Sequence, residues 1–139
     1  MSDLPLTGGC LCGAVRFELA VAPLDAGYCH CTHCQQRTGT AASAQALIEG
    51  SALAFTAGEE LVAGWTPPAG GMEKCFCGVC GGHLLSRDPD TKVPGAIRMG
   101  AFDSDPGVPF SYRQFLRSAA TWEPVPDDGL TRFEGRRTG

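Results

Sequence analysis

The sequence is poor in charged residues and has no run of one sign. Charged side chains make up 19% of its 139 residues, the formal net charge is −4, and the densest basic pair is Arg136-Arg137. A protein that binds nucleic acid neutralises phosphates with clustered lysine and arginine residues. The composition therefore argues against nucleic-acid or chromatin binding.

Long apolar runs are also absent from the sequence. No stretch approaches the roughly 18 apolar residues that a membrane helix requires. The first residues, Met1 to Pro5, have neither the basic start nor the apolar run of a secretion signal. We therefore expect a cytoplasmic protein that does not enter a membrane, and the thiols of such a protein stay reduced.

Internal repeats and low-complexity linkers are missing as well, so we expect one domain over residues 1–139. Apolar residues make up 43% of the chain, which is enough for a folded core and argues against disorder. The 19 glycines and 10 prolines favour turns over long helices.

Short segments with a period of two predict strands. In the segment 14–19, Val15, Phe17 and Leu19 alternate with charged residues, the pattern of a half-buried strand. Residues 22–27 are expected to form a connector. Further strands are expected at 41–48, 53–55, 61–63, 96–99 and 111–116. Short strands and frequent turns predict a mainly β fold of antiparallel strands.

Cysteine is the residue that the sequence has in excess, with eight residues in three tight clusters. The clusters are Cys10-Leu11-Cys12-Gly13, Cys29-His30-Cys31-Thr32-His33-Cys34 and Cys75-Phe76-Cys77-Gly78-Val79-Cys80-Gly81. Disulfides are disfavoured in a cytoplasmic protein, and scattered buried thiols would not gather in close pairs. Zinc binding is therefore the leading interpretation.

Two of the close pairs predict a closed zinc site. Cys77 and Cys80, followed by Gly81, have the spacing of a zinc knuckle, in which glycine lets the chain fold back. Structural zinc takes four ligands, so a second pair is needed, and Cys10 with Cys12 is the natural one. The alternatives are disulfides and unbound thiols.

The remaining cluster predicts a second zinc site with a vacant ligand position. Cys29, Cys31 and Cys34 offer three thiolates within six residues, and no fourth cysteine clearly joins them. Catalytic zinc keeps one position open for water or substrate. The alternative is a site closed by one of three further residues, Cys75, His33 or His30.

Three residues near the clusters are expected to play other roles. We interpret Cys75 as a small buried residue or a spare thiol. His30 lies between two ligands, where an extended chain turns its side chain the opposite way, so it would support the ligands rather than bind metal. His83 is expected at the surface or in a hydrogen bond.

The cysteine motifs together resemble the glutathione-dependent formaldehyde-activating (GFA) family, whose domain is shared with centromere protein V. The matching stretches are Gly9–Val15, Cys29–Cys34 with Gly39, Phe76–Gly81, Gly100–Asp103 with Asp105-Pro106, and the late Trp122. The resemblance covers about residues 7–125, nearly the whole chain. It implies a β-tent fold, a zinc-binding domain related to zinc ribbons.

The resemblance also implies an activity and two zinc ions per chain. The family's named activity joins glutathione to formaldehyde, giving S-hydroxymethylglutathione, and is classed as that of a carbon–sulfur lyase. The implied ligands of the structural zinc are Cys10, Cys12, Cys77 and Cys80. The implied ligands of the catalytic zinc are Cys29, Cys31 and Cys34.

Two positions are candidates for substrate binding. Gln35 follows the third catalytic cysteine, where the family often has a basic residue. Trp122 would form an apolar wall of the site or pack in the core. Where the family often has a histidine before its late tryptophan, this chain has Tyr112 and Arg113.

Two classes of function follow from these residues. The first is a zinc enzyme of the carbon–sulfur lyase type that acts on an adduct of a thiol, such as glutathione, with a carbonyl compound; Arg37, Arg98 or Arg113 would neutralise a substrate carboxylate. The alternative is a non-catalytic, zinc-stabilised module that binds a protein partner. A fourth protein ligand at the second zinc would favour the module, and assembly into a homo-oligomer stays open.

Overall fold

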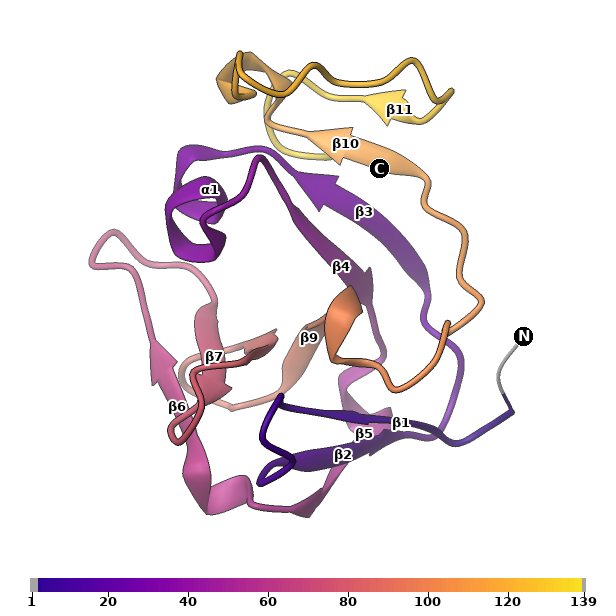
Figure 1. Cartoon of the computed structure of the whole chain (residues 1–139), viewed down its shortest axis with the longest axis vertical. Helices are drawn as coiled ribbons and strands as arrows, with labels where there is room; N and C mark the ends of the chain where they lie inside the picture. Colours follow the sequence, from indigo (N-terminus) through magenta and orange to yellow (C-terminus); the bar gives the residue numbers. More distant parts are fainter. Residues whose placement is uncertain (1–2, 139) are drawn as a thin grey trace. The chain divides into compact units, whose positions relative to one another are not determined.

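The computed structural model describes residues 3–138 and is mainly β, as the sequence predicts (Figure 1). The chain forms two compact units. The first unit comprises the chain up to Leu24 and Ala46–Val108; the second comprises Asp25–Gln45 and the chain from Pro109 on. The expectation of one domain over residues 1–139 stays a prediction. No helix among the described residues is long and apolar enough to cross a membrane.

The first unit contains two sets of short antiparallel strands. One set has the order β1-β2-β5 and consists of β1 (Leu6–Gly9), β2 (Arg16–Leu19) and β5 (Leu53–Ala57). The other has the order β9-β8-β7-β6 and consists of β6 (Val62–Trp65), β7 (Glu73–Cys77), β8 (His83–Arg87) and β9 (Pro94–Arg98). Single 3-10 turns lie at Gly50–Ala52, Glu59–Leu61 and Met99–Ala101.

Alternating burial explains why these segments form strands. In β2, Phe17 and Leu19 are buried while Arg16 and Glu18 are half-buried, because successive side chains of a strand point to opposite faces. The period of two in the sequence therefore predicts both this strand and its buried face.

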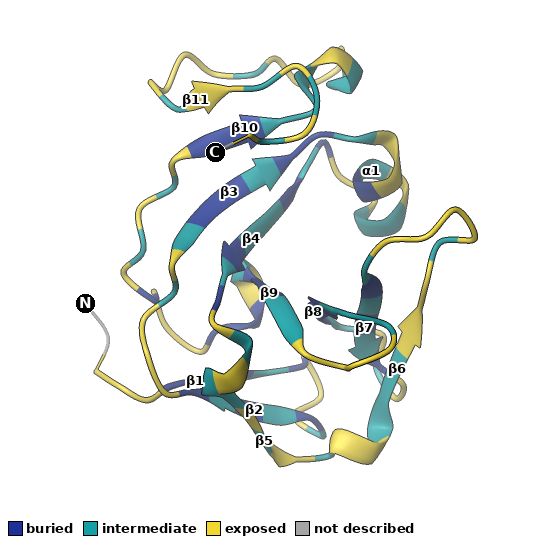
Figure 2. Ribbon diagram, turned by 180° about the vertical axis from the view of Figure 1, so that it is seen from behind, coloured by how far each residue is buried: buried dark blue, intermediate teal, exposed yellow. Residues whose placement is uncertain are grey.

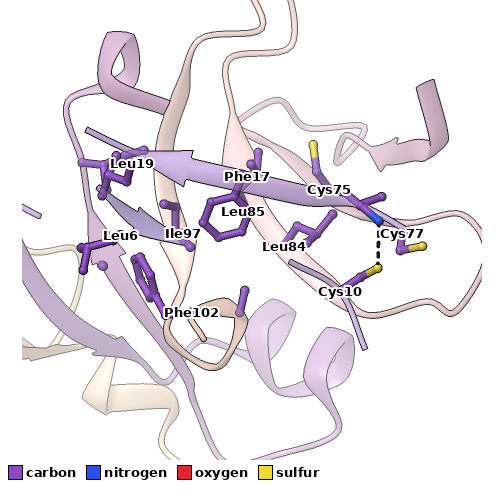
Figure 3. Close-up of a cluster of buried hydrophobic side chains, with 14 residues drawn as sticks. Leu6, Cys10, Phe17, Leu19, Cys75, Cys77, Leu84, Leu85, Ile97 and Phe102 are labelled. Atoms are coloured by element: carbon purple, nitrogen blue, oxygen red, sulfur yellow. Dashed lines mark hydrogen bonds between the residues drawn. The ribbon is translucent and has the colours of Figure 1, made fainter. Parts of the chain in front are cut away.

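The hydrophobic core of the first unit is built from both sets of strands. Phe17, Leu84, Leu85 and Ile97 are almost fully buried in it. Three cysteines belong to the same cluster, and Figure 3 shows Cys10, Cys75 and Cys77 together at one end of it. The four-cysteine site described below is therefore anchored in packed apolar side chains.

The second unit contains one helix and a set of strands in the order β11-β10-β3-β4. These elements are β3 (Asp25–Cys29), α1 (Thr32–Thr38), β10 (Tyr112–Gln114), a 3-10 turn at Leu116–Ser118 and β11 (Thr131–Arg132). β4 (Ser43–Leu47) begins in this unit and ends in the first. In Figure 2, β10 is coloured mostly as buried and β11 as exposed.

Two features of the second unit differ from the expectations. The segment 22–27 is not a connector throughout, because β3 already begins at Asp25. Its small residues serve close packing: a Cβ atom on Gly27 would lie 2.2 Å from the ring of Tyr112. β10 pairs in parallel with both β3 and β11. The pairs β1–β2, β2–β5, β6–β7, β7–β8 and β8–β9 are antiparallel, as predicted.

Candidate metal centres

The first candidate centre brings together four cysteine sulfurs within the first unit. The sulfurs of Cys10, Cys12, Cys77 and Cys80 all lie within 4.8 Å of one another. Cys10 directly follows β1, and Cys77 is the last residue of β7. The structure thus groups the two pairs that the sequence predicts to share one ion.

The first pair lies in a tight turn that glycines make possible. Cys10 N–H donates to the Val15 carbonyl at 3.1 Å, and the Val15 N–H donates to the Cys10 sulfur at 3.3 Å. Gly13 has a φ of 81°, a conformation that favours glycine. A Cβ atom on Gly9 would lie 2.3 Å from the Val15 carbonyl oxygen, so a side chain there would clash with the turn.

The second pair lies in a turn of the same design. The Gly81 N–H donates to the Cys77 carbonyl at 2.8 Å, and Gly81 has a φ of 78°. The Val79 N–H donates to the Cys77 sulfur at 3.3 Å. In both turns a backbone N–H therefore points at a sulfur, which favours the thiolate form that metal requires.

The spacing of the sulfurs fits a tetrahedral zinc site. Zinc–thiolate bonds of about 2.3 Å place two sulfurs of a tetrahedron about 3.8 Å apart. The sulfur of Cys12 lies 3.6 Å from that of Cys10 and 3.9 Å from that of Cys77, far beyond a disulfide bond of about 2.05 Å. Burial raises the pKa of Cys10, but the Val15 N–H and the three neighbouring thiols outweigh it and lower the pKa to about 6.

The second candidate centre lies where β3 passes into α1 in the second unit. Cys29 ends β3, Cys31 is the N-cap of α1 and Cys34 is in its first turn, and their sulfurs lie within 4.8 Å of one another. The Cys31 sulfur accepts a hydrogen bond from the Cys34 N–H at 3.3 Å, the usual bond of an N-cap side chain. The Cys-x-x-Cys spacing therefore starts a helix and gathers sulfurs at the same time.

The three thiols of the second centre differ in their surroundings. Hydrogen bonding with Cys31 and Cys34 raises the pKa of Cys29, while hydrogen bonding with Cys29 and Cys31 lowers that of Cys34. Arg37 Nη2 donates to the Cys34 sulfur at 3.6 Å. The Ser43 hydroxyl is buried beside Cys34 and also lowers the pKa of that thiol.

No further side chain joins this centre among the described residues of the second unit. In the described part of this unit, one group of three or more His, Cys, Asp or Glu residues has all its ligand atoms within 4.8 Å of one another. Its members are Cys29, Cys31 and Cys34. Neither His30 nor His33 belongs to the group. The three sulfurs thus offer one side of a metal site, as the ligand count in the sequence predicts, and the vacant fourth position stays a prediction.

His30 is bound to a buried arginine, Arg113. Its Nε2 lies 3.1 Å from Nη1 of Arg113, which forms an ion pair with Asp128 at 2.9 Å and stacks on Tyr28 with its guanidinium carbon 4.1 Å from the ring centroid. Because guanidinium only donates, Nε2 accepts and the proton is on Nδ1. Burial, followed by the charge of Arg113, lowers the pKa of His30 and keeps the ring neutral.

The two residues predicted to bind substrate have different surroundings. The Gln35 side-chain amide donates to the carbonyls of His30 and Ser118, each at 2.8 Å, so its nitrogen ties two backbone segments together. Trp122 is 66% exposed, which excludes the alternative role in core packing and leaves its ring at the surface. The substrate roles of both residues stay predictions.

The other residues that the sequence singled out lie in the first unit. Cys75 is buried in the hydrophobic core, as expected for a small apolar residue, and is not among the grouped sulfurs. His83 begins β8 and is half-buried. Arg98 is buried and donates to the Ser86 hydroxyl at 2.6 Å, whereas Arg37 is the arginine that contacts a cysteine of the second centre.

A cavity of about 280 Å³ lies in the second unit, but none of the three cysteines of the second centre lines it. Its lining includes His30, the residue between two of the grouped cysteines, together with Tyr28, Arg113, Glu123 and the segment 124–126. Sequence reasoning missed Asp128 and Ser43, because their contacts join residues far apart in the chain. The contact of Arg37 with Cys34 follows from their spacing of three on α1, and the sequence does not predict that helix.

Comparisons with known proteins agree with this geometry. A family model described as glutathione-dependent formaldehyde-activating enzyme matches residues 5–118. No curated protein matches the chain. Among solved structures, a crystal structure of a Rhodobacter sphaeroides protein from a structural genomics programme is similar to the chain, with a TM-score of 0.55 and 22% identity over 91% of this chain and 98% of that one. At this identity the likeness shows the fold alone.

Proposed function

Because the chain belongs to the glutathione-dependent formaldehyde-activating (GFA) family, we propose that it is a zinc-dependent enzyme of the carbon–sulfur lyase type. The substrate class is an adduct of a thiol with a carbonyl compound, and S-hydroxymethylglutathione, formed from glutathione and formaldehyde, is the first candidate. Cys10, Cys12, Cys77 and Cys80 hold one Zn²⁺ for structure, and Cys29, Cys31 and Cys34 hold the other for catalysis.

The observation that carries the proposal is the contrast between the two centres. Four sulfurs complete a tetrahedron, whereas three leave room for a ligand that is not part of the protein. When bound there, Zn²⁺ supplies a Lewis acid that favours the thiolate form of a thiol and polarises a carbonyl oxygen.

The residues around the second centre support the proposed catalytic role in three ways. The N-cap bond of Cys31 sets the first turn of α1, and with it the position of Cys34. Burial, followed by the charge of Arg113, lowers the pKa of His30, so the residue between Cys29 and Cys31 adds no positive charge of its own. Arg37 Nη2 donates to the Cys34 sulfur at 3.6 Å, so a positive charge lies beside the thiolates.

Cobalt substitution tests the open position directly. Co²⁺ replaces Zn²⁺ in thiolate sites and gives absorption bands that respond to a change of ligand. In the Co²⁺-loaded protein we expect the bands to shift on addition of glutathione, and the shift to be absent in Cys31→Ser. A fully loaded protein whose spectrum ignores glutathione and other small thiols would overturn the proposal.

A second candidate function, a protein-binding module, is favoured by one observation. Leu11 and Val79, at the tips of the two turns of the first centre, are 92% and 66% exposed. Where such side chains form one continuous apolar patch, the patch is typical of a docking surface. Coordination numbers decide between the two functions: four protein ligands at each zinc favour the module, and three at the second zinc favour the enzyme.

A further inference from the structure

In the second centre, the Cys34 sulfur accepts a hydrogen bond from a positively charged side chain, Arg37. Arg37 Nη2 lies 3.6 Å from it, an ordinary N–H···S distance. Cys34 is buried, and Arg37, in the last turn of α1, is half-buried. The pair therefore lies where water screens charge less than at an open surface.

The positive charge matters because of the charge of the metal site. Three thiolates and one Zn²⁺ together carry one net negative charge, and a thiolate as fourth ligand raises this to two. A neutral fourth ligand leaves the charge unchanged. A nearby guanidinium therefore stabilises the thiolate-bound form more than the form with a neutral ligand.

Two other arginines of this unit have partners away from the three sulfurs. Arg113 is bound to Asp128 and His30, and Arg137 is bound to Asp25. Gln35, directly after Cys34, is neutral and binds backbone carbonyls. Arg37 is the cation that the structure places on a sulfur of the second centre.

We propose that Arg37 determines which fourth ligand the second centre accepts, favouring an anionic thiolate over a neutral donor. The inference rests on the proposed function, since it requires a metal ion with a vacant position. It identifies Arg37 as the specificity-determining residue for thiol-bearing substrates. No bond is made or broken in this role, which is one of charge alone.

The experiment compares an anionic and a neutral fourth ligand on the Co²⁺-loaded full chain. Mercaptoacetate and imidazole are titrated into wild type, Arg37→Met, Arg37→Lys and Arg136→Met, and dissociation constants are taken from the cobalt absorption bands. Arg136 is exposed, so Arg136→Met removes the same charge from the protein surface and serves as the control. Metal content is measured for every variant.

We expect Arg37→Met to weaken mercaptoacetate binding about tenfold, the scale of one charged hydrogen bond, and to change imidazole binding less than about twofold. Arg37→Lys restores most of the thiolate affinity, and Arg136→Met resembles wild type. Equal weakening of both ligands would mean a structural role and overturn the inference, as would an unchanged thiolate affinity in Arg37→Met.

Two further outcomes separate this inference from the proposed function. If wild type binds mercaptoacetate but Arg37→Met binds it equally well, only the inference is wrong. If loaded wild type binds neither ligand, the open position does not exist and both are wrong. If Arg37→Met does not retain cobalt, the comparison passes to Arg37→Lys, whose ratio of thiolate to imidazole affinity must stay within about threefold of that of wild type.

Discussion

Cys75 and Cys77 lie two positions apart on β7, yet they have different roles. Both side chains are buried on the same face of the strand, as expected for residues two apart. Only Cys77, at the end of the strand, reaches the turn in which the other three sulfurs gather. Position relative to the strand end, rather than residue type, therefore decides which thiol joins the metal centre.

Cys77→Ser should unfold the protein. Removing one of four thiolates releases the structural ion, and zinc binding free energy is folding free energy in such sites, so we expect a loss of more than about 4 kcal/mol in the free energy of unfolding. Chemical denaturation followed by circular dichroism measures it. Cys75→Ala is the matched control and should cost about 1 kcal/mol while retaining two zinc ions per chain.

Cys31→Ser should separate metal binding from helix formation. Serine is itself a good N-cap, so α1 keeps its first turn, and we expect a loss of only about 1–2 kcal/mol in stability. The zinc content should fall from two ions per chain to one, and thiol binding should be lost. Mass spectrometry under native conditions counts the ions; unfolding as complete as that of Cys77→Ser would contradict the division into a structural and a catalytic centre.

Glu73 should make stability depend on acid pH. Its carboxylate accepts from Arg87 at 2.7 Å and from Lys92 at 3.1 Å, and Arg87 above all holds its pKa below the ordinary 4.5. Because the folded-state pKa is the lower one, the stabilisation is present above pH 4.5 and is lost as the pH falls through the folded-state value.

The measurement for Glu73 is a comparison of unfolding curves between pH 7 and pH 3. Glu73→Gln should cost about 1–3 kcal/mol at pH 7, and its difference from wild type should shrink as the pH falls below 4.5. Acid also releases zinc from thiolates, but it does so in both proteins. The exposed Glu60→Gln is the control and should show no such pH-dependent difference.

At the scale of elements, turns and helix ends place the sulfurs. α1 ends at Gly39, which has a φ of 71° and whose N–H donates to the Gln35 carbonyl at 2.8 Å. Gly8, inside β1, is needed for a different reason. A Cβ atom on Gly8 would lie 2.3 Å from the Ala101 carbonyl oxygen. One glycine is required by backbone conformation and the other by lack of space.

Alanine substitutions should distinguish these two requirements. Gly39→Ala has open space around its new methyl group, so we expect only the conformational cost of about 1 kcal/mol. Gly8→Ala forces the backbone apart beside the turn that begins at Cys10, so we expect a loss of about 3 kcal/mol or more in the free energy of unfolding. Thermal unfolding of both variants with zinc present measures the two losses of stability. Equal losses in Gly8→Ala and Gly39→Ala would contradict the prediction.

The sequence predicts those parts of the fold that depend on local spacing. Paired cysteines with glycines identify the turns of the first centre, and the period of two identifies β2. Helix α1 is not predicted, because seven residues are too few to show helical periodicity. The ion pair of Arg113 with Asp128 is also not predicted, because it depends on the parallel pairing of β10 with β11, which no local pattern encodes.

For the whole molecule, the two centres should lose metal in two stages. A site with three protein ligands and an exchangeable fourth binds zinc less tightly than a closed set of four thiolates. We expect a moderate concentration of chelator to remove one ion per chain with little change in the circular dichroism spectrum. Removal of the second ion should coincide with unfolding, and simultaneous release of both ions would contradict the assignment of distinct roles.

The long separation within the first centre affects how the protein forms during synthesis. Cys12 and Cys77 are 65 positions apart, so at about 5–20 residues per second their emergence from the ribosome is separated by about 3–13 s. During that interval the nascent chain carries a pair of thiols whose partners have not yet been made. Under the proposed zinc assignment, we expect the yield of loaded protein to depend on the supply of zinc and reductant while translation proceeds.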